Sequence, residues 1–303
     1  MPEEPPFPII DVTDWEITNV ETSGAEAKFW LEEPDTERHW LFKSVTIKNG
    51  HVHGEDWAEK AASHLGRLMG IPCAQVELAV RGEAVGSISA NLRPALYQMQ
   101  PGQVVLESCR APGYVHHSRG KLHPGHSLEN IRDALAGAMA PPSSEVPFNA
   151  SAFDIFAGYV LFDAWIANQD RHDNNWSVLI PITATAGPML LSGSYDHASS
   201  LAFNEQDIRC ETLLNQSDGV AGWCARGKAN RFEGRPKLAE AATTALRLAS
   251  TEAREYWPEQ LRRVSDGDAR QVLSRVPRMS DVARMFATKL LEANRMGVLN
   301  ACA

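Results

Sequence analysis

The stretch Asn168-Gln169-Asp170-Arg171-His172-Asp173-Asn174-Asn175 follows the longest strongly apolar run of the chain, at residues 153–167. That run is shorter than a membrane span and contains Asp154 and Asp163, so we expect a buried helix rather than a transmembrane one. A polar loop that leaves the end of a buried helix is fixed rigidly against the core. The pattern therefore predicts a functional site at residues 168–175, built on a firm support.

Within this loop, Asp170 and Asn175 stand five residues apart. Phosphoryl transfer needs a carboxylate that orients the attacking hydroxyl or accepts its proton, oxygen ligands for Mg²⁺, and a lysine that grips the phosphates. In kinase catalytic loops the base Asp and the metal-binding Asn have this same separation. The spacing alone is common, and polar loop residues often serve only as turn formers. The hypothesis therefore depends on further elements in the right order along the chain.

A second candidate metal ligand follows in the segment Gly193-Ser194-Tyr195-Asp196-His197. Asp196 lies 26 residues after Asp170, and the residues between them are enough for two short strands and a turn. Such a hairpin would return Asp196 to the catalytic loop. Carboxylate and amide oxygens suit Mg²⁺, so Asp196 and Asn175 are the predicted metal ligands.

The phosphate-binding elements are expected before the loop. Lys43 ends an apolar strand, and Glu59 or Glu55 lies on the helix that follows it. A strand lysine paired with a helix glutamate is the kinase arrangement for holding phosphates, and the sequence leaves the choice between the two glutamates open. The small-residue turn at 22–28 would let backbone N–H groups approach phosphates.

The pattern of apolar residues predicts an α+β fold with a small β-rich lobe, a larger helical lobe and a cleft between them. The order of the candidate site residues makes this two-lobed fold protein-kinase-like, with the cleft as the site of a nucleotide. Residues 1–92 are expected to form a small β-rich N-lobe and residues 93–303 a larger, mostly helical C-lobe. The expected strands are at 15–17, 28–31, 39–43, 76–80, 84–88, 176–180 and 189–191, and the expected helices are at 55–69, 128–139, 153–167 and from 238 onward.

Three local expectations complete the prediction. Residues 1–10 are expected to be a loose leader, and residues 100–127 a long polar loop that carries several histidines. The last helix is expected to begin at Ser280 or Asp281 as its N-cap. Its apolar residues at helical spacing predict one buried face, made of Val282, Met285, Phe286 and Leu290.

Composition restricts the classes of partner. The formal net charge of -9 gives no basic footprint for nucleic acid or an anionic membrane. The five cysteines have no C-x-x-C spacing, which favours a reducing, cytoplasmic location over a disulfide scaffold. The acidic, proline-rich residues 1–6 are unlike a signal peptide.

The stretch at 167–177 resembles the N-x-D-x-H-x-x-N-[FW]-S loop of the HipA-like serine/threonine protein kinases, whose fold is a variant of the protein kinase and phosphatidylinositol kinase folds. Tyr195-Asp196 is similar to the metal motif of that family, residues 23–28 to its phosphate loop, and residues 59–72 to its helix ending. The resemblance covers roughly residues 15–295 and is closest to the short, C-terminal-type members.

The resemblance implies ATP and Mg²⁺ as cofactors and a Ser or Thr of another protein as substrate. A toxin role beside a separate small antitoxin is a further implication. The resemblance assigns Asp170 as the catalytic base and Asn175 and Asp196 as metal ligands. His172 would shape the loop near the γ-phosphate. The nucleotide-binding residues that it implies are Ser23, Gly24, Lys28, Lys43, Glu59, Ser89 and Asn91.

The resemblance is incomplete at the phosphate loop. Long members of the family autophosphorylate a Ser three residues before the loop Gly, where this chain has Glu21 beside Thr22 and Ser23. Glu26 replaces the Gln of the family loop. Inhibitory autophosphorylation is therefore either absent or moved to a neighbouring residue.

Other readings of these residues stay open. A nucleotide-binding pseudokinase that serves as a scaffold, or a phosphatidylinositol or small-molecule kinase, would use many of the same residues. The histidines at 116, 117, 123 and 126 fit no zinc template and are read as part of a polar loop. Ser192 and Ser194 near His197 suggest a hydrolase, but the chain has no G-x-S-x-G elbow.

Overall fold

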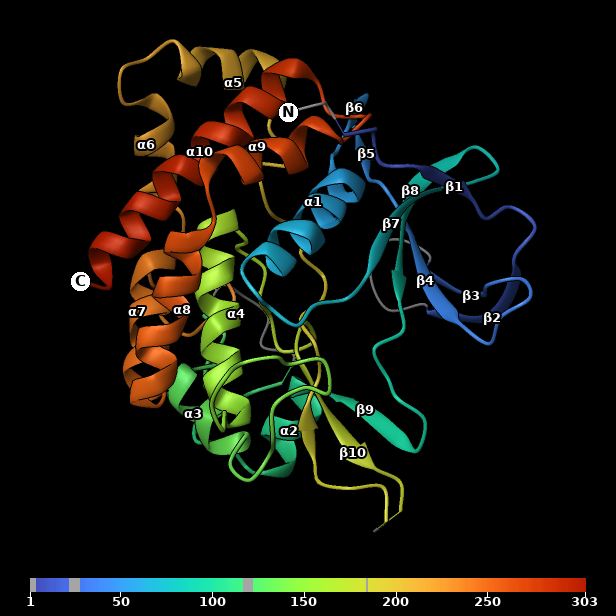
Figure 1. Ribbon diagram of the computed structural model, residues 1–303, viewed down its shortest axis with the longest axis vertical. Helices are drawn as coiled ribbons and strands as arrows, with labels where there is room; N and C mark the ends of the chain where they lie inside the picture. The colour runs from blue at the N-terminus through green and yellow to red at the C-terminus, as the bar shows by residue number, and fades with distance from the viewer. Residues whose placement is uncertain (1–3, 22–27, 117–121, 184) are drawn as a thin grey trace.

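A mixed sheet and a helical body make up the computed structural model, which describes residues 4–21, 28–116, 122–183 and 185–303 (Figure 1). Within these residues, one six-stranded sheet has the order β1-β7-β8-β4-β3-β2. Its strands are β1 (Ile9–Asp11), β2 (Glu16–Glu21), β3 (Lys28–Glu32), β4 (His39–Ser44), β7 (Val76–Arg81) and β8 (Ala84–Ala90). The strands predicted in the N-terminal part of the chain are confirmed, and the fold is of the predicted α+β class.

The alternation of side chains along β4 separates a core face from a cleft face. Trp40 and Phe42 are buried and pack in a small apolar cluster with Leu31. Leu41 and Lys43 line a cleft instead. Successive side chains of a strand point to opposite faces, so the pattern that buries the aromatic residues also sends Lys43 toward the site.

Helix α1 (Glu55–Leu68) contacts β7 and β8 and lies between the sheet and the C-terminal helices (Figure 1). It ends where predicted, with Met69 as its C-cap. Gly70 takes a φ of +74°, which is the left-handed conformation that glycine adopts without strain after a helix.

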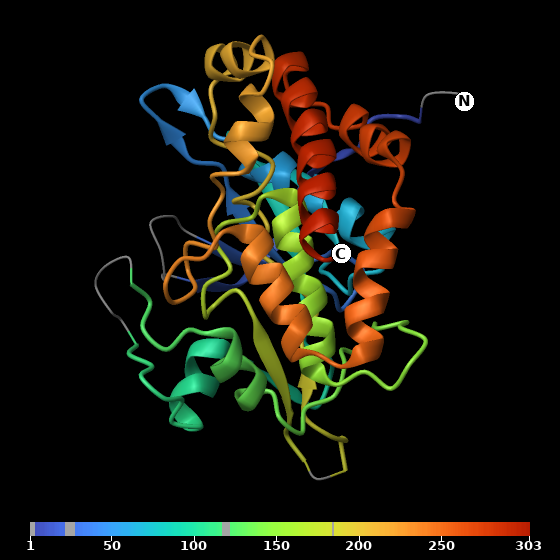
Figure 2. The same cartoon turned by 90° about the vertical axis from the view of Figure 1, so that its left-hand side faces the viewer.

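Helix α4 (Ala152–Ile166) is the centre of the helical body, and all of its residues are buried. Ser151 and Asp154 form a capping box at its start. Helices α7, α8 and α10 pack around it (Figures 1 and 2). The remaining body consists of α2 (Gly102–Ser108), α3 (Leu128–Ala134), α5 (Asp207–Leu214), α6 (Gly219–Cys224), α7 (Leu238–Leu248), α8 (Thr251–Arg263), α9 (Asp266–Ser274) and α10 (Asp281–Ala301).

Two small sheets complete the fold. Strands β9 (Tyr97–Pro101), β10 (Ser177–Pro181) and β11 (Leu190–Leu191) form one of them, with β10 in the middle. Strands β5 (Ile47–Lys48) and β6 (His51–Val52) form a separate hairpin. The predicted hairpin between Asp170 and Asp196 is therefore confirmed as β10 and β11, and it returns the chain toward the catalytic loop.

The expected loose leader at residues 1–10 is wrong for its described part. Strand β1 pairs in parallel with β7, and the Phe7 side chain is only 3% exposed. The Phe7 ring lies 4.2 Å from the guanidinium carbon of Arg275 and 4.7 Å from Lys60 Nζ. These partners are distant in sequence, so a local pattern could not reveal them.

Three further expectations also need correction. The polar loop expected at 100–127 contains α2, whose Leu106 is buried in the main core. Helix α3 ends at Ala134 rather than at 139. On α10, Ser280 is the N-cap as predicted, but Met285 is 56% exposed and lies outside the buried face. The boundary at residues 92 and 93 stays a prediction.

No helix in the described part of the chain combines the length and the apolar composition that crossing a bilayer requires. The most apolar helix, α4, owes its composition to its place at the centre of the helical body.

Candidate active site

A cleft of about 1140 Å³ opens between the cleft face of β2–β4, the crossover at residues 89–93 and the loop after α4. Its volume is comparable to that of pockets which hold nucleotide-sized ligands. The predicted site residues that line it are Lys28, Lys43, Ser89, Asn91, His172, Asn175 and Asp196. Residues far apart in the sequence thus converge on one cavity.

Lys43 and Asp196 form the charged centre of the cleft. Lys43 Nζ lies 2.9 Å from Asp196 Oδ2. Burial alone would lower the pKa of Lys43, but the carboxylates of Asp196 and Glu59 outweigh it and raise that pKa. Burial opposes ionisation of Asp196 as well, yet Lys43 holds the pKa of this carboxyl well below its ordinary value. Both groups are therefore charged at neutral pH.

The backbone of Asp196 takes a φ of +59°, in the left-handed region that residues other than glycine rarely adopt. Such conformations are strained and persist where the surrounding structure enforces them, often at functional sites. The turn that carries Asp196 is therefore held by its neighbours.

Asn175 is buried beside Asp170. Its Nδ2 donates to the Asp170 carbonyl oxygen at 2.8 Å, so its side-chain oxygen is the atom that suits a cation. No group of three or more His, Cys, Asp or Glu side chains with metal-site geometry occurs in the described part of the chain. One carboxylate, one amide oxygen and phosphate oxygens are a donor set that Mg²⁺ uses, so Asn175 and Asp196 fit that ion.

Asp170 is about one quarter exposed, and its carboxylate forms an ion pair with Arg231 Nε. The Asp170 backbone N–H donates to Asn168 Oδ1 at 3.1 Å. Arg231 lies 61 residues further along the chain, in the segment before α7, and sequence reasoning missed it. No local motif marks it, because only the tertiary fold brings it to the catalytic loop.

The segment around Arg231 is anchored by His126. The His126 Nδ1 donates to the Arg231 carbonyl oxygen at 2.7 Å, and its Nε2 accepts from Trp176 Nε1 at 3.2 Å. Burial lowers the pKa of His126 to about 4, so the ring is neutral. Both ring nitrogens are engaged, which argues against His126 as a zinc ligand.

A buried ion pair fixes the loop at residues 168–175 against the core. Arg171 Nε and Nη2 each donate to the Asp163 carboxylate at 2.7 Å. The Asp163 carboxylate also accepts from Asn168 Nδ2 at 2.8 Å, and Arg171 Nη1 donates to the Asn175 carbonyl oxygen at 2.7 Å. The carboxylate of Asp163, within the apolar run at 153–167, therefore supports the loop from the core.

The two glutamates left open by the sequence have different partners. Glu55 accepts from the Thr46 backbone N–H at 2.6 Å. Glu59 Oε1 lies 3.5 Å from His197 Nδ1, and Glu59 shares a side cavity of about 180 Å³ with Lys43. Across the described residues, the ion pair of Lys43 is with Asp196, and the pairing of Lys43 with a helix glutamate stays a prediction.

The hydrolase hypothesis is contradicted by the burial of the serine that would act as nucleophile. Ser194 Oγ lies 2.8 Å from His197 Nε2, and Glu59 faces the other ring nitrogen, so the three side chains have the order of a hydrolase triad. All three are buried, and Ser194 Oγ also accepts from Arg171 Nη2 at 3.0 Å. A nucleophile enclosed in this way cannot reach a substrate.

Ser23 and Gly24, predicted to bind phosphates, lie outside the described residues. Glu21, which precedes them, lines the cleft and accepts from Trp30 Nε1 at 2.8 Å. Lys28, which follows them, lines the same cleft. Both residues that flank the predicted phosphate turn thus lie at this cleft.

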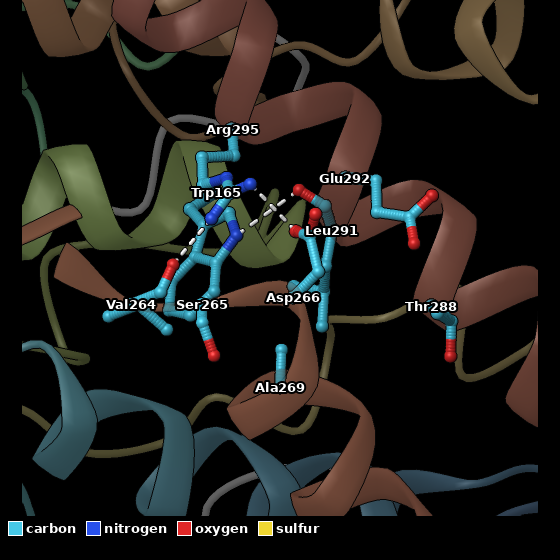
Figure 3. Close-up of a pocket in the computed structure, with 9 residues that line it drawn as sticks. All are labelled: Trp165, Val264, Ser265, Asp266, Ala269, Thr288, Leu291, Glu292 and Arg295. Carbon is cyan, nitrogen blue, oxygen red and sulfur yellow. Dashed lines mark hydrogen bonds and ion pairs between the residues drawn. The ribbon is translucent and has the colours of Figure 1, made fainter. Parts of the chain in front are cut away.

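A second depression, between α4, α9 and α10, has a volume of about 10 Å³ (Figure 3). Trp165 Nε1 donates to the Leu291 carbonyl oxygen at 3.2 Å, and Arg295 pairs with Asp266 at 2.8 Å. A cavity of this size holds one water at most. It is a packing defect with satisfied polar groups and does not compete with the cleft as a ligand site.

The fold and the cleft define a two-lobed protein of the kinase-like class. The Helicobacter pylori proinflammatory kinase CtkA is similar in structure, with a TM-score of 0.76 and 14% sequence identity over 97% of each chain. The HipA of Shewanella oneidensis MR-1, solved with HipB and operator DNA, has a TM-score of 0.56 and 14% identity over 99% of this chain and 67% of that one. At such identities the likeness shows the fold alone.

The family is shown by sequence. The model of the HipA-like C-terminal domain matches residues 20–267, and the chain belongs to this family. Among curated proteins, no sequence matches. The resemblance read from the catalytic loop is therefore confirmed at the level of the family.

Proposed function

We propose that this protein is an ATP- and Mg²⁺-dependent serine/threonine protein kinase of the HipA type. The observation that carries the proposal is the convergence of Lys43, Asn175 and Asp196 on one cleft, with Asp170 held beside Asn175. Kinases need these residue types at these places, and little else, because phosphoryl transfer depends on positioning and charge. Family membership supports the same reading.

Each residue has a distinct proposed role. Asp170 accepts or orients the proton of the attacking hydroxyl, and Lys43 binds phosphate oxygens. Asn175 and Asp196 hold Mg²⁺, which when bound neutralises charge on the phosphates. Lys43 also forms an ion pair with Asp196, so this carboxylate is not left buried and unpaired.

The other predicted cleft residues complete the nucleotide site in this proposal. The adenine is placed beside the backbone at Ser89–Leu92, and Lys28 contacts the phosphates. Burial lowers the pKa of His172, with Asp170 and Asp196 opposing the shift, so the ring is neutral at pH 7. A neutral His172 can donate a hydrogen bond to a phosphate oxygen without adding charge.

A partner and a location belong to the same proposal. The Shewanella HipA was solved with HipB and operator DNA, which supports a small antitoxin as a partner of this chain. A cytoplasmic location agrees with the five cysteines, all of which are free. Residues 1–92 and 93–303 are proposed as the two lobes.

A pseudokinase is the second candidate, and the Arg231–Asp170 ion pair favours it. Arg231 engages the carboxylate that a substrate hydroxyl would need, so an active enzyme must share or displace this contact. A pseudokinase would be stabilised thermally by ATP with no dependence on Mg²⁺ and no turnover. A kinase would show dependence on Mg²⁺ and turnover of ATP.

The deciding experiment is mass spectrometry of the purified protein and a generic Ser/Thr substrate after incubation with MgATP. A mass gain of one phosphate on either, absent when Mg²⁺ is chelated, is the expected result. The same spectra identify whether Thr22, Ser23 or another residue is modified. ATP binding with no phosphate on any protein would leave the pseudokinase as the better reading.

A further inference from the structure

His197 lies one residue after the proposed metal ligand Asp196 and is 1% exposed. Its two ring nitrogens face different elements of the fold. Nε2 lies 2.8 Å from Ser194 Oγ, in the same turn, and Nδ1 lies 3.5 Å from Glu59 Oε1, on α1. The ring therefore joins the turn that carries Asp196 to the helix of the β-rich part.

Ser194 extends this connection to the catalytic loop. Its hydroxyl accepts from Arg171 Nη2 at 3.0 Å, and Arg171 also donates to the carbonyl oxygens of Asn175 and Tyr195. A serine that accepts from Arg171 can donate its own O–H to His197 Nε2, which leaves the ring proton on Nδ1, toward Glu59. The contacts run without a break from α1 to the loop that carries Asp170.

Side-chain packing encloses the ring of His197. Phe162, on α4, meets the His197 ring edge to face, with centroids 5.4 Å apart and an interplanar angle of 76°. The Ser194 backbone is fixed as well, because its N–H donates to the Pro72 carbonyl oxygen at 2.8 Å. His197 is thus enclosed by side chains from α1, α4 and its own turn.

The turn needs this support. Asp196 has a φ of +59° and its carboxylate is aimed at Lys43 across the cleft. A strained backbone is kept only where its neighbours enforce it. Without a hydrogen-bonded residue at 197, the turn could relax and move the Asp196 carboxylate away from Asn175.

We propose that His197 is a positioning residue for the metal site: through Glu59 and Ser194 it holds the turn of Asp196 in the conformation that binds the divalent cation. Glu59, one of the two glutamates expected to pair with Lys43, acts in this proposal by anchoring the histidine. The inference rests on the proposed function, since it assumes that Asp196 ligates a cation with the nucleotide. Its consequence is a change in metal affinity that leaves the binding of nucleotide alone intact.

The test replaces His197 and measures metal binding separately from activity. Mn²⁺ suits the same oxygen ligands as Mg²⁺ and can be titrated by electron paramagnetic resonance in the presence of a non-hydrolysable ATP analogue. Loss of a residue that orients a metal ligand costs about 10- to 100-fold in metal affinity. We expect that rise in the Mn²⁺ dissociation constant for His197→Phe, with metal-free binding of the analogue equal to wild type.

Two further variants keep the test decisive. His64→Phe makes the same replacement at a histidine that is only partly buried, lies on α1 and does not line the cleft, and it should leave Mn²⁺ affinity unchanged. If His197→Phe does not fold, His197→Gln retains one of the two polar contacts and should weaken Mn²⁺ binding by a smaller factor.

The outcomes separate the inference from the proposed function. Wild-type Mn²⁺ affinity in a folded His197 variant would overturn the role of His197 while leaving the kinase proposal in place. Equal losses of metal-free and metal-dependent nucleotide binding would mark His197 as merely structural and also overturn it. If the wild-type protein binds no Mn²⁺ with the analogue, the proposed function itself falls, and this inference falls with it.

Discussion

Replacing Asp163 with Ala should destabilise the protein more than almost any other polar substitution. Asp163 and Arg171 are both buried, and two hydrogen bonds of 2.7 Å join them side by side. The substitution leaves the Arg171 guanidinium buried without its carboxylate. Breaking a buried pair in this way costs about 3–5 kcal/mol, because the remaining charge is uncompensated. The loss of contacts to Asn168 adds to that cost.

Urea unfolding followed by tryptophan fluorescence would measure the effect. A matched control is Glu259→Ala, which breaks the exposed ion pairs of Glu259 with Arg262 at 3.2 Å and with Arg263 at 3.3 Å. Such surface pairs contribute about 0–1 kcal/mol, so the control should scarcely change the midpoint. The double variant Asp163→Leu with Arg171→Met should be more stable than Asp163→Ala, because it buries no charge. A cost below about 1 kcal/mol for Asp163→Ala would refute the view that this pair supports the loop.

Three further predictions follow from single contacts. As the pH falls from 6.5 to 4, His126 should lower the stability of the wild-type protein by up to about 3 kcal/mol, because the unfolded chain binds a proton that the folded ring, with a pKa of about 4, does not bind. His126→Gln should flatten this part of the profile of thermal stability against pH. An unchanged slope in that variant would contradict the prediction. Gly158→Ala should lower the free energy of unfolding by about 1–3 kcal/mol despite the better helix propensity of alanine, because its Cβ would overlap the Trp257 ring. A stabilised variant would refute the packing argument. Lys43→Met should reduce kcat/KM for ATP about 10- to 100-fold through the loss of a charge-assisted bond to phosphate, whereas Lys48→Met, on the β5–β6 hairpin, should not.

Local sequence was sufficient for the parts of the site that local structure builds. The apolar run of α4 ends at Ala167, which takes a left-handed φ of +57°, and the polar loop begins there. The hairpin of β10 and β11 returns Asp196 to that loop because its length allows only a short turn. Alternation along β4 sends Lys43 to the cleft. Each of these features is encoded within a few residues.

Contacts between distant segments were not predictable in the same way. Arg231 reaches Asp170 from a segment whose own sequence has no motif, and the His126 that anchors it was read as one of several loop histidines. Glu59 or Glu55 was expected to pair with Lys43, and spacing alone cannot tell which cation a buried carboxylate meets. In the structure Glu59 faces His197, and Phe162 packs against the ring of that histidine in a way that no local pattern records.

The most direct test of the central claim is transfer of labelled γ-phosphate from MgATP by the wild-type protein and by Asp170→Ala and Asp196→Ala. Wild-type protein should incorporate label, and each variant should lose about 10²- to 10⁴-fold of the rate while remaining folded, since the base and the metal ligand act in the same step. Incorporation at the wild-type rate by either variant would contradict the assignment of this cleft as the site of phosphoryl transfer.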